Sequence, residues 1–391
     1  MRDVRIRGAA TTRFAKHEDR GARDLVEEAV AAALREAEID PRDVGCAYVG
    51  NAAAGLVLGQ ECIRGQVVLR RTGLMGAPIV NVENACASSS TALHLGWQAV
   101  AGGIHDCVVV IGFEKIDHHD QHRMDLVTNA TMDLAEVDEI WGEGVWLERN
   151  VYRDVMAVSA SALGVDRFGG EMMALVAVKN RRHAALNPCA LHQDEVTVEQ
   201  VLSAPPMAGM LTTHMIADMC DGAACLVLCA GDFRRGRPGG VRLTASVLSS
   251  GRADDMRRRF SVGLTASRAY EMASIGPEDL DVVELYDATT VSELYLYAEL
   301  GLCPLDDVER LVRERATWLG GRVPVNPSGG LLGRGHPIGA TGVAQVAELV
   351  AQLEGRCGAR QVPEARVALA ENTGGWVGSD VAACCVHVLQ V

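Results

Sequence analysis

Apolar runs of strand length alternate with helical patterns along most of this chain, and this alternation limits the folds that the chain can adopt. In the N-terminal part, strands are predicted at 4–12, 44–50, 77–83 and 106–114, with helices at 24–39 and directly after Cys86. The run at 106–114 is apolar almost throughout, as expected of a strand buried on both faces of a sheet. The pattern therefore predicts stacked β-α-β units and an α/β fold.

The same order of elements returns in the C-terminal part. Strands are predicted at 241–250, 280–287, 365–375 and 379–391, and helices at 263–275, 290–302 and after the glycine-rich loop of His336. We predict two similar halves, 1–235 and 236–391, whose pseudo-twofold packing brings Cys86 and His336 to one site. Residues 116–215 lack the alternation, which indicates an inserted loop domain that covers this site.

Bulk properties exclude several classes of protein. The 391 residues carry a net charge of −14, which argues against binding to nucleic acid or to an anionic membrane surface. No apolar run reaches the roughly 18 residues that a membrane span needs, and no signal-peptide pattern is present. The 12 cysteines are scattered along the chain. A cytoplasmic protein with reduced thiols is predicted.

Cys86 and His336 are the residues whose surroundings indicate chemistry. Cys86 lies between a strand and a helix, where the helix dipole favours a thiolate, although a buried cysteine is often an inert hydrophobe. His336 lies in GRGHPIGATG (333–342), where it could activate a nucleophile or have no role. The loop does not fit G-x-G-x-x-G, because Pro337 interrupts it, so no dinucleotide site is predicted.

Four motifs follow one another along the chain: NACASSS (84–90), VVELYDATT (282–290), GGLLGRGHPIGATG (329–342) and ENTGGWVGSDVAACCVHVL (371–389). Together they resemble the thiolase superfamily, especially its lipid-transfer (sterol-carrier) type and the archaeal-type acetyl-CoA acetyltransferases. The resemblance implies a five-layered αβαβα thiolase fold with two pseudo-symmetric halves and a loop domain. It also implies an acyltransferase with a coenzyme A thioester as substrate, no tightly bound cofactor, a homodimer or homotetramer, and a small OB-fold acyl-CoA-associated partner.

The resemblance assigns roles to three residues. Cys86 matches the nucleophile that takes the acyl group, and His336 matches the histidine that activates it and helps to bind the thioester oxygen. Gly374 matches the glycine whose N–H completes an oxyanion hole with that of the nucleophile. A thiolate that attacks a thioester beside preorganised donors needs no metal.

Two positions depart from the family pattern. Asn372 stands where many thiolases have a second cysteine that acts as a base, and asparagine cannot do so. The H-D-C-F motif of the lipid-transfer type is replaced here by Tyr286-Asp287-Ala288-Thr289. Tyr286 could act as an acid or base, hold an oxyanion, or be structural; its ordinary pKa near 10 makes it a poor base unless the site lowers it. Claisen condensation is therefore less favoured than transfer to an already activated acceptor.

Two polar clusters have simpler interpretations. DHHDQH (117–122) contains metal-ligand residue types, but adjacent ligands on one stretch rarely close a tetrahedral site, so no metal is predicted. Arg257, Arg258 and Arg259 match either a contact for a coenzyme A phosphate or a solvated face.

The predicted function is acyl transfer through Cys86, with His336 as its partner. Two other functions stay open. One is retro-aldol cleavage of coenzyme A thioester side chains, by analogy with relatives that use tyrosines and lack the cysteine and the G-H-P histidine. The other is a non-catalytic subunit that binds an acyl-CoA or lipid.

Overall fold

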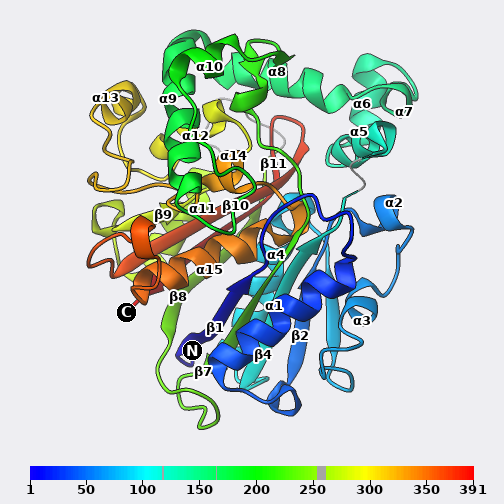
Figure 1. The fold of residues 1–391 in the computed structure, drawn as a ribbon, viewed down its shortest axis with the longest axis vertical. Helices are drawn as coiled ribbons and strands as arrows, with labels where there is room; N and C mark the ends of the chain where they lie inside the picture. The colour runs from blue at the N-terminus through cyan, green and yellow to red at the C-terminus, as the bar shows by residue number, and fades with distance from the viewer. Residues whose placement is uncertain (117–118, 164, 253–260) are drawn as a thin grey trace.

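The computed structural model describes residues 1–116, 119–163, 165–252 and 261–391 (Figure 1). Asp117 and His118 of the polar cluster, and all three arginines at 257–259, lie outside the described residues. Among the described residues, no group of three or more histidine, cysteine, aspartate or glutamate side chains has a geometry that could hold a metal ion. In the same part of the chain, no helix has the length and apolarity that crossing a membrane requires.

The N-terminal half contains a five-stranded sheet in the order β3-β2-β4-β7-β1. Its strands are β1 (Val4–Thr11), β2 (Cys46–Gly50), β3 (Ile79–Val82), β4 (Cys107–Glu114) and β7 (Gly222–Ala230). β2 pairs in parallel with β3 and β4, whereas β7 is antiparallel to β4 and β1. All eight residues of β4 are buried, as the apolar run predicts.

The C-terminal half repeats this order with β8-β11-β10-β9. The strands are β8 (Val241–Ser250), β9 (Val282–Glu284), β10 (Val367–Val377) and β11 (Asp380–Gln390). A parallel bridge from Val283 to Val325 adds a fifth position at the same edge as β3 in the first sheet. The repeat inferred from the sequence is thus a repeat of strand order, although the boundary at 235/236 stays a prediction.

Helices form three layers around these two sheets. α1 (Ala22–Ala37) covers the outer face of the first sheet with α3 (Arg64–Val68), and α11 (Ser261–Ala273) covers the outer face of the second. α4 (Ser88–Ala101) and α15 (Thr341–Leu353) lie between the sheets and contact strands of both (Figure 1). Every residue of α15 except Ala351 is buried, because sheets lie on both of its sides. The five-layered αβαβα fold is therefore confirmed.

The two sheets are joined at one corner, which the sequence did not predict. β1 pairs with β8 through Arg5–Arg242 and Ile6–Val241 only. This short contact links the sheets into a continuous series of nine strands. It pairs the two edge strands with each other and leaves fewer backbone groups exposed at those edges.

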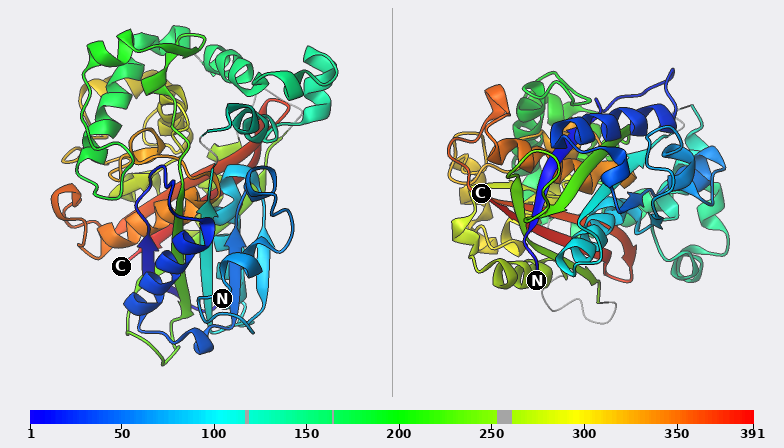
Figure 2. Two further views of the ribbon diagram at one scale, coloured as in Figure 1. Left: turned by 45° about the vertical axis from the view of Figure 1, so that its right-hand side comes forward. Right: turned by 90° about the horizontal axis from the view of Figure 1, so that it is seen from below.

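The segment predicted as a loop domain is mostly helical. It contains α5 (Gln121–Asn129), α6 (Leu134–Trp141), α7 (Val145–Glu148), α8 (Val151–Leu163), α9 (Val165–Ala185) and α10 (Val198–Ser203), followed by the short strands β5 (Pro206–Ala208) and β6 (Leu211–Thr212). These helices lie over one end of the sheets, at the top of Figure 1, and the rotated views show the same cap (Figure 2). The site described below lies under this cap.

The remaining helices are α2 (Ala54–Leu58), α12 (Thr290–Glu299), α13 (Val308–Arg313) and α14 (Gly330–Arg334). The helix predicted at 290–302 is confirmed as α12, whereas α2, α13 and α14 were not predicted. α14 lies inside the glycine-rich segment, which was expected to be a plain loop before α15. β9 ends at Glu284 rather than at Asp287, so Tyr286 and Asp287 lie just beyond the strand.

Candidate active site

Cys86 lies in a tight turn between β3 and α4, under the loop region. The turn is a short 3₁₀ helix, Ala85–Ala87, and Ala85 has a left-handed φ of 48°. The Ser88 hydroxyl accepts a hydrogen bond from the Asn84 backbone N–H at 3.0 Å and donates one to the Ala85 carbonyl at 2.6 Å. A strained residue held by such contacts is a common feature of functional turns, because the surrounding structure must maintain it.

His336 is fixed in one orientation by Thr341. The Thr341 hydroxyl donates to the Pro337 carbonyl at 3.0 Å, so its oxygen accepts from the His336 ring at Nδ1, 2.8 Å away. We assign the ring proton to Nδ1 on this basis. The lone pair on Nε2 therefore points toward the site, where it can accept a proton.

Tyr286 connects the two predicted residues. Its hydroxyl lies 3.2 Å from Nε2 of His336, and their rings meet edge to face at 78°. The same hydroxyl lies beside the Cys86 thiol and lowers the pKa of that thiol. The Cys86 thiol, the Tyr286 phenol and the His336 imidazole are thus neighbours in that order, and we call them the series.

Burial keeps all three groups neutral. It raises the pKa of Cys86 to about 11, against the smaller effect of the Tyr286 hydroxyl. It lowers the pKa of His336 to about 3, with a further contribution from Arg334, and it raises the pKa of Tyr286 well above 10. The expectation that the helix dipole would favour a thiolate was wrong, because desolvation outweighs it. Tyr286 is likewise a proton donor, not a base, at neutral pH.

These protonation states predict slow alkylation of Cys86 in the absence of substrate. Because the pKa of the thiol is raised to about 11, the thiolate fraction increases about tenfold per pH unit throughout the neutral range. Iodoacetamide labelling, followed by peptide mass spectrometry between pH 7 and 9.5, is expected to accelerate at Cys86 without a plateau. The exposed Cys62 provides an internal control for reagent activity. A plateau near pH 7 to 8 would contradict the buried neutral thiol.

Gly374 and Asn372 both belong to β10 but have different surroundings. A Cβ on Gly374 would lie 2.2 Å from the Asn84 carbonyl oxygen and 2.5 Å from the Ala87 nitrogen, so only glycine fits against the Cys86 turn. Asn372 is buried and lines neither pocket at the site. The placement of Gly374 is compatible with its predicted oxyanion role, whereas the role of Asn372 stays a prediction.

Glu114 was missed by the sequence analysis, although it ends the buried run at 106–114. Its carboxylate is fully buried and accepts hydrogen bonds from the backbone N–H groups of Gly339, Ala52 and Ala53 and from the Asn51 amide, at 2.9 to 3.3 Å. Burial raises its pKa to about 7. Glu114 ties the loop after β2 to the segment that carries His336. Its position could have been noticed in the sequence, because a carboxylate at the end of an otherwise apolar strand is unusual.

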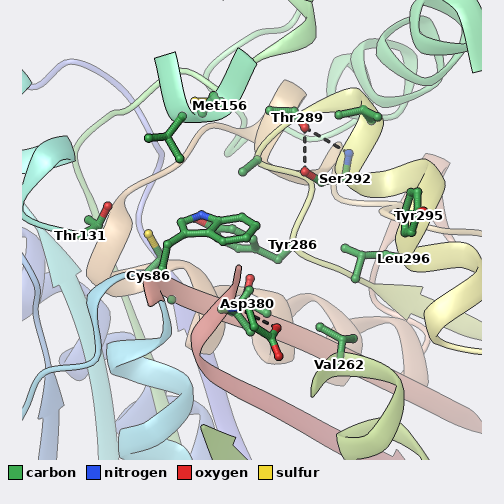
Figure 3. Close-up of a pocket in the computed structure, with 18 of the residues that line it drawn as sticks. Cys86, Thr131, Met156, Val262, Tyr286, Thr289, Ser292, Tyr295, Leu296 and Asp380 are labelled. Carbon is green, nitrogen blue, oxygen red and sulfur yellow. Dashed lines mark hydrogen bonds between the residues drawn. The ribbon is translucent and has the colours of Figure 1, made fainter. Parts of the chain in front are cut away.

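Two pockets meet at Cys86. They share six lining residues, which are Cys86, Thr131, Tyr152, Met156, Tyr286 and Ala288. We call the first pocket, of about 120 Å³, the apolar arm, and the second, of about 260 Å³, the polar arm. Figure 3 shows the apolar arm, with Cys86 and Met156 at one side and Val262 and Leu296 at the other.

The two arms differ in chemistry. The apolar arm runs between α8, α11, α12 and the β10–β11 hairpin, and most of its wall is aliphatic or aromatic. The polar arm includes His336, the exposed cations Lys16 and Arg153, and the carboxylates of Asp125 and Asp218. Tyr152 and Met156 come from α8 in the loop region, where no sequence motif indicated them.

Cys86 is the only cysteine among the described residues that line the two arms. Cys384 and Cys385 are buried in β11. All 12 cysteines belong to the described ranges and are free thiols. The site as described therefore holds one nucleophilic sulfur and no second thiol.

Two protein-family models match the chain, one in each half. The family model described as "Thiolase, N-terminal domain" matches residues 4–202, and the one described as "Thiolase C-terminal domain-like" matches residues 245–387. The chain belongs to the thiolase family. It is accordingly an acyltransferase, as the sequence predicted.

Relatives of known name cover the whole chain. Acetyl-CoA acetyltransferase from Methanothermobacter thermautotrophicus is 35% identical over 398 residues, covering 100% of both chains. Benzoylsuccinyl-CoA thiolase subunit BbsB from Thauera aromatica is 36% identical and covers 96% of this chain and 95% of its own. Sterol carrier protein 2 from Oryctolagus cuniculus is 34% identical and covers 95% of this chain and 70% of its own.

Solved structures confirm the fold. The Ltp2-ChsH2(DUF35) aldolase superposes with a TM-score of 0.80 at 23% identity, over 100% of this chain and 98% of that one. Human mitochondrial 3-ketoacyl-CoA thiolase superposes with a TM-score of 0.72 at 18% identity, with the same coverage. At these identities the likeness concerns the fold alone.

Proposed function

We propose that this chain takes an acyl group from a coenzyme A thioester onto Cys86 and passes it to coenzyme A or to another activated nucleophile. The observation that carries the proposal is the series of Cys86 thiol, Tyr286 hydroxyl and His336 Nε2 at the junction of two pockets. The names of the relatives support it, since they include an acetyl-CoA acetyltransferase and a benzoylsuccinyl-CoA thiolase.

In the first step, the sulfur of Cys86 attacks the thioester carbonyl carbon. The thiol proton passes to the Tyr286 oxygen while the phenol proton passes to Nε2 of His336, which is neutral and accepts it. The bond between the carbonyl carbon and the sulfur of coenzyme A then breaks, and the proton returns to that sulfur. Such base assistance is needed because the buried thiol does not ionise by itself at neutral pH.

The developing oxyanion needs preorganised donors. We assign this role to the backbone N–H groups of Cys86 and Gly374, because β10 packs directly on the Cys86 turn. Loss of one such donor typically costs about 3 kcal/mol in the barrier.

The charges of the two arms indicate how the substrate lies. Lys16 and Arg153 in the polar arm attract the phosphates of coenzyme A, and the polar side chains deeper in this arm suit the amides of its pantetheine part. Two carboxylates line each arm, but among the described residues that line the apolar arm there is no lysine or arginine that could bind a phosphate. Coenzyme A therefore occupies the polar arm, and the acyl group faces the apolar arm.

Because the described residues that line the site include only one thiol, the nature of the acceptor of the acyl group is restricted. Condensation of two acyl-CoA molecules needs a base for the α-carbon, and Tyr286 is held protonated by burial. Transfer to coenzyme A, or to a carbon nucleophile that is already electron-rich, needs no second thiol. These acceptors fit the site best.

A second candidate function is favoured by one observation, a pair of phenols at the thiol. Tyr152 and Tyr286 both line the junction, and burial raises the pKa of each, so both phenols stay protonated at neutral pH. Two protonated phenols could donate to a carbonyl during retro-aldol cleavage. That reaction would not need Cys86, which separates the two functions experimentally.

We also propose an assembly. The relative from Thauera aromatica is named as a subunit, and the neighbouring aldolase structure contains a DUF35 component. These names support an assembly with a second, different chain, and the family resemblance implies a homo-oligomer that binds a small OB-fold partner.

Intact-protein mass spectrometry tests the proposed function. The purified chain is mixed with acetyl-CoA, propionyl-CoA and longer acyl-CoA molecules, with and without a candidate OB-fold partner, and Cys86→Ser serves as control. A mass increase equal to the acyl group that disappears in Cys86→Ser is expected. No adduct with any thioester would reject acyl transfer in favour of the aldolase or a non-catalytic binding subunit.

Replacing Tyr286 by phenylalanine tests the proton path. Tyr286→Phe keeps the ring but removes the hydroxyl between the thiol and Nε2, and acylation of Cys86 is expected to slow by about 100-fold. Rapid-quench mass spectrometry measures that rate. The matched control is Tyr270→Phe, which removes a buried hydroxyl bonded to the Leu300 carbonyl, outside the site. Equal acylation rates in Tyr286→Phe and the wild type would show that His336 contacts the thiol without Tyr286.

A further inference from the structure

The apolar arm continues beyond the space that an acetyl group needs. Starting at Cys86, it passes Met156 and reaches Val262, Val291 and Leu296, all three of which are buried (Figure 3). Its volume is about 120 Å³. For scale, an engineered apolar cavity of about 150 Å³ in another protein holds one benzene ring. An acetyl group on Cys86 would leave most of this arm empty.

The far end of the apolar arm contains two carboxylates that already accept hydrogen bonds from the protein. Asp380 accepts hydrogen bonds from the Ser261 hydroxyl at 2.5 Å and from the Arg252 backbone N–H at 3.1 Å. Glu299 accepts one from the Gly263 backbone N–H at 2.9 Å. Both carboxylates thereby hold the start of α11.

The apolar wall selects among acyl groups. An acyl chain that ends in a carboxylate would bring a negative charge into a largely apolar cavity, which is costly because a buried charge needs a partner of opposite sign. A neutral hydrocarbon end contacts Val262, Val291 and Leu296 without such a cost. Among the described residues that line this arm there is no lysine, arginine or histidine that could neutralise a terminal carboxylate.

We infer that the preferred acyl group is neutral, apolar and about the size of one phenyl ring or of a five- to six-carbon chain. The inference rests on the proposed function, since it concerns the acyl group that Cys86 carries. It assigns specificity to Val262, Val291 and Leu296, which no sequence motif indicated. Each buried methylene strengthens binding by severalfold, so the preference over acetyl is expected to reach at least about tenfold in kcat/KM for acylation.

The experiment measures acylation of Cys86 by mass spectrometry with four probes. They are acetyl-CoA, valeryl-CoA, benzoyl-CoA and glutaryl-CoA, the last being a five-carbon acyl group with a terminal carboxylate. We expect valeryl and benzoyl transfer to exceed acetyl transfer, and glutaryl transfer to be at least about tenfold slower than valeryl transfer. Acylation by acetyl-CoA but not by valeryl-CoA or benzoyl-CoA would overturn the inference and leave the proposed function intact. No adduct with any probe would overturn the proposed function itself.

Two variants with opposite effects locate the specificity. Val262→Phe fills the arm and is expected to lower the ratio of valeryl to acetyl kcat/KM at least about tenfold, whereas Leu296→Ala enlarges it and is expected to raise the ratio of octanoyl to acetyl kcat/KM. Met272→Phe, on the exposed side of the same helix as Val262, is the matched control and is expected to change neither ratio. If Val262→Phe does not fold, Leu296→Ala decides: an unchanged octanoyl ratio overturns the assignment.

Discussion

Cys86→Ala is expected to abolish the acyl-enzyme and to reduce acyl transfer by at least about 10⁴-fold, because removal of a nucleophile leaves only binding and oxyanion contacts. No other cysteine among the described residues lines the two arms, so no neighbouring thiol can substitute. The measurement combines intact mass after incubation with valeryl-CoA and steady-state release of coenzyme A. Cys62→Ala, at an exposed position, is the matched control and should retain full activity.

The same variant separates the two candidate reactions. If carbon–carbon cleavage of a coenzyme A thioester side chain persists in Cys86→Ala, the pair of phenols at Tyr152 and Tyr286 carries the chemistry, and acyl transfer through the thiol is rejected. If both cleavage and transfer disappear while thermal unfolding is unchanged, the thiol is the nucleophile.

His336→Asn is expected to slow acylation by about 10³-fold at pH 7, since asparagine cannot accept the thiol proton. The pH profile should change in a specific way. Burial lowers the pKa of His336 to about 3, so the wild-type imidazole is neutral and able to act as a base throughout pH 5 to 8, and the acylation rate should be nearly flat there. In the variant, the reaction depends on spontaneous ionisation of a thiol with a pKa of about 11, so the rate should increase about tenfold per pH unit.

Rapid-quench mass spectrometry across pH 5 to 9 measures both profiles. His105→Asn, in the segment that follows the far end of α4, is the matched control and should keep the flat profile. A flat profile in His336→Asn, with a rate like that of the wild type, would place the base elsewhere. The two profiles should converge as the pH approaches the pKa of the thiol, because base assistance loses its advantage there.

The sequence by itself determined the fold class and singled out all three groups, Cys86, Tyr286 and His336, as candidates. Alternating buried strands and amphipathic helices are local patterns, and they predicted two repeated halves before any contact was known. Cys86 and His336 precede the equivalent helices α4 and α15, so symmetry of the halves was enough to bring them together. The absence of a second thiol was also visible, because it depends on residue identity alone.

Only the tertiary structure decided how these residues work. Protonation depends on burial, which comes from contacts between residues far apart in sequence, and burial reversed the expectation of a thiolate at Cys86. The proposed proton path uses Tyr286, which lies just beyond the end of β9. The apolar arm combines residues of α8, α11, α12 and the β10–β11 hairpin. No local pattern specifies such a cavity, because its shape is what remains when distant elements pack against one another.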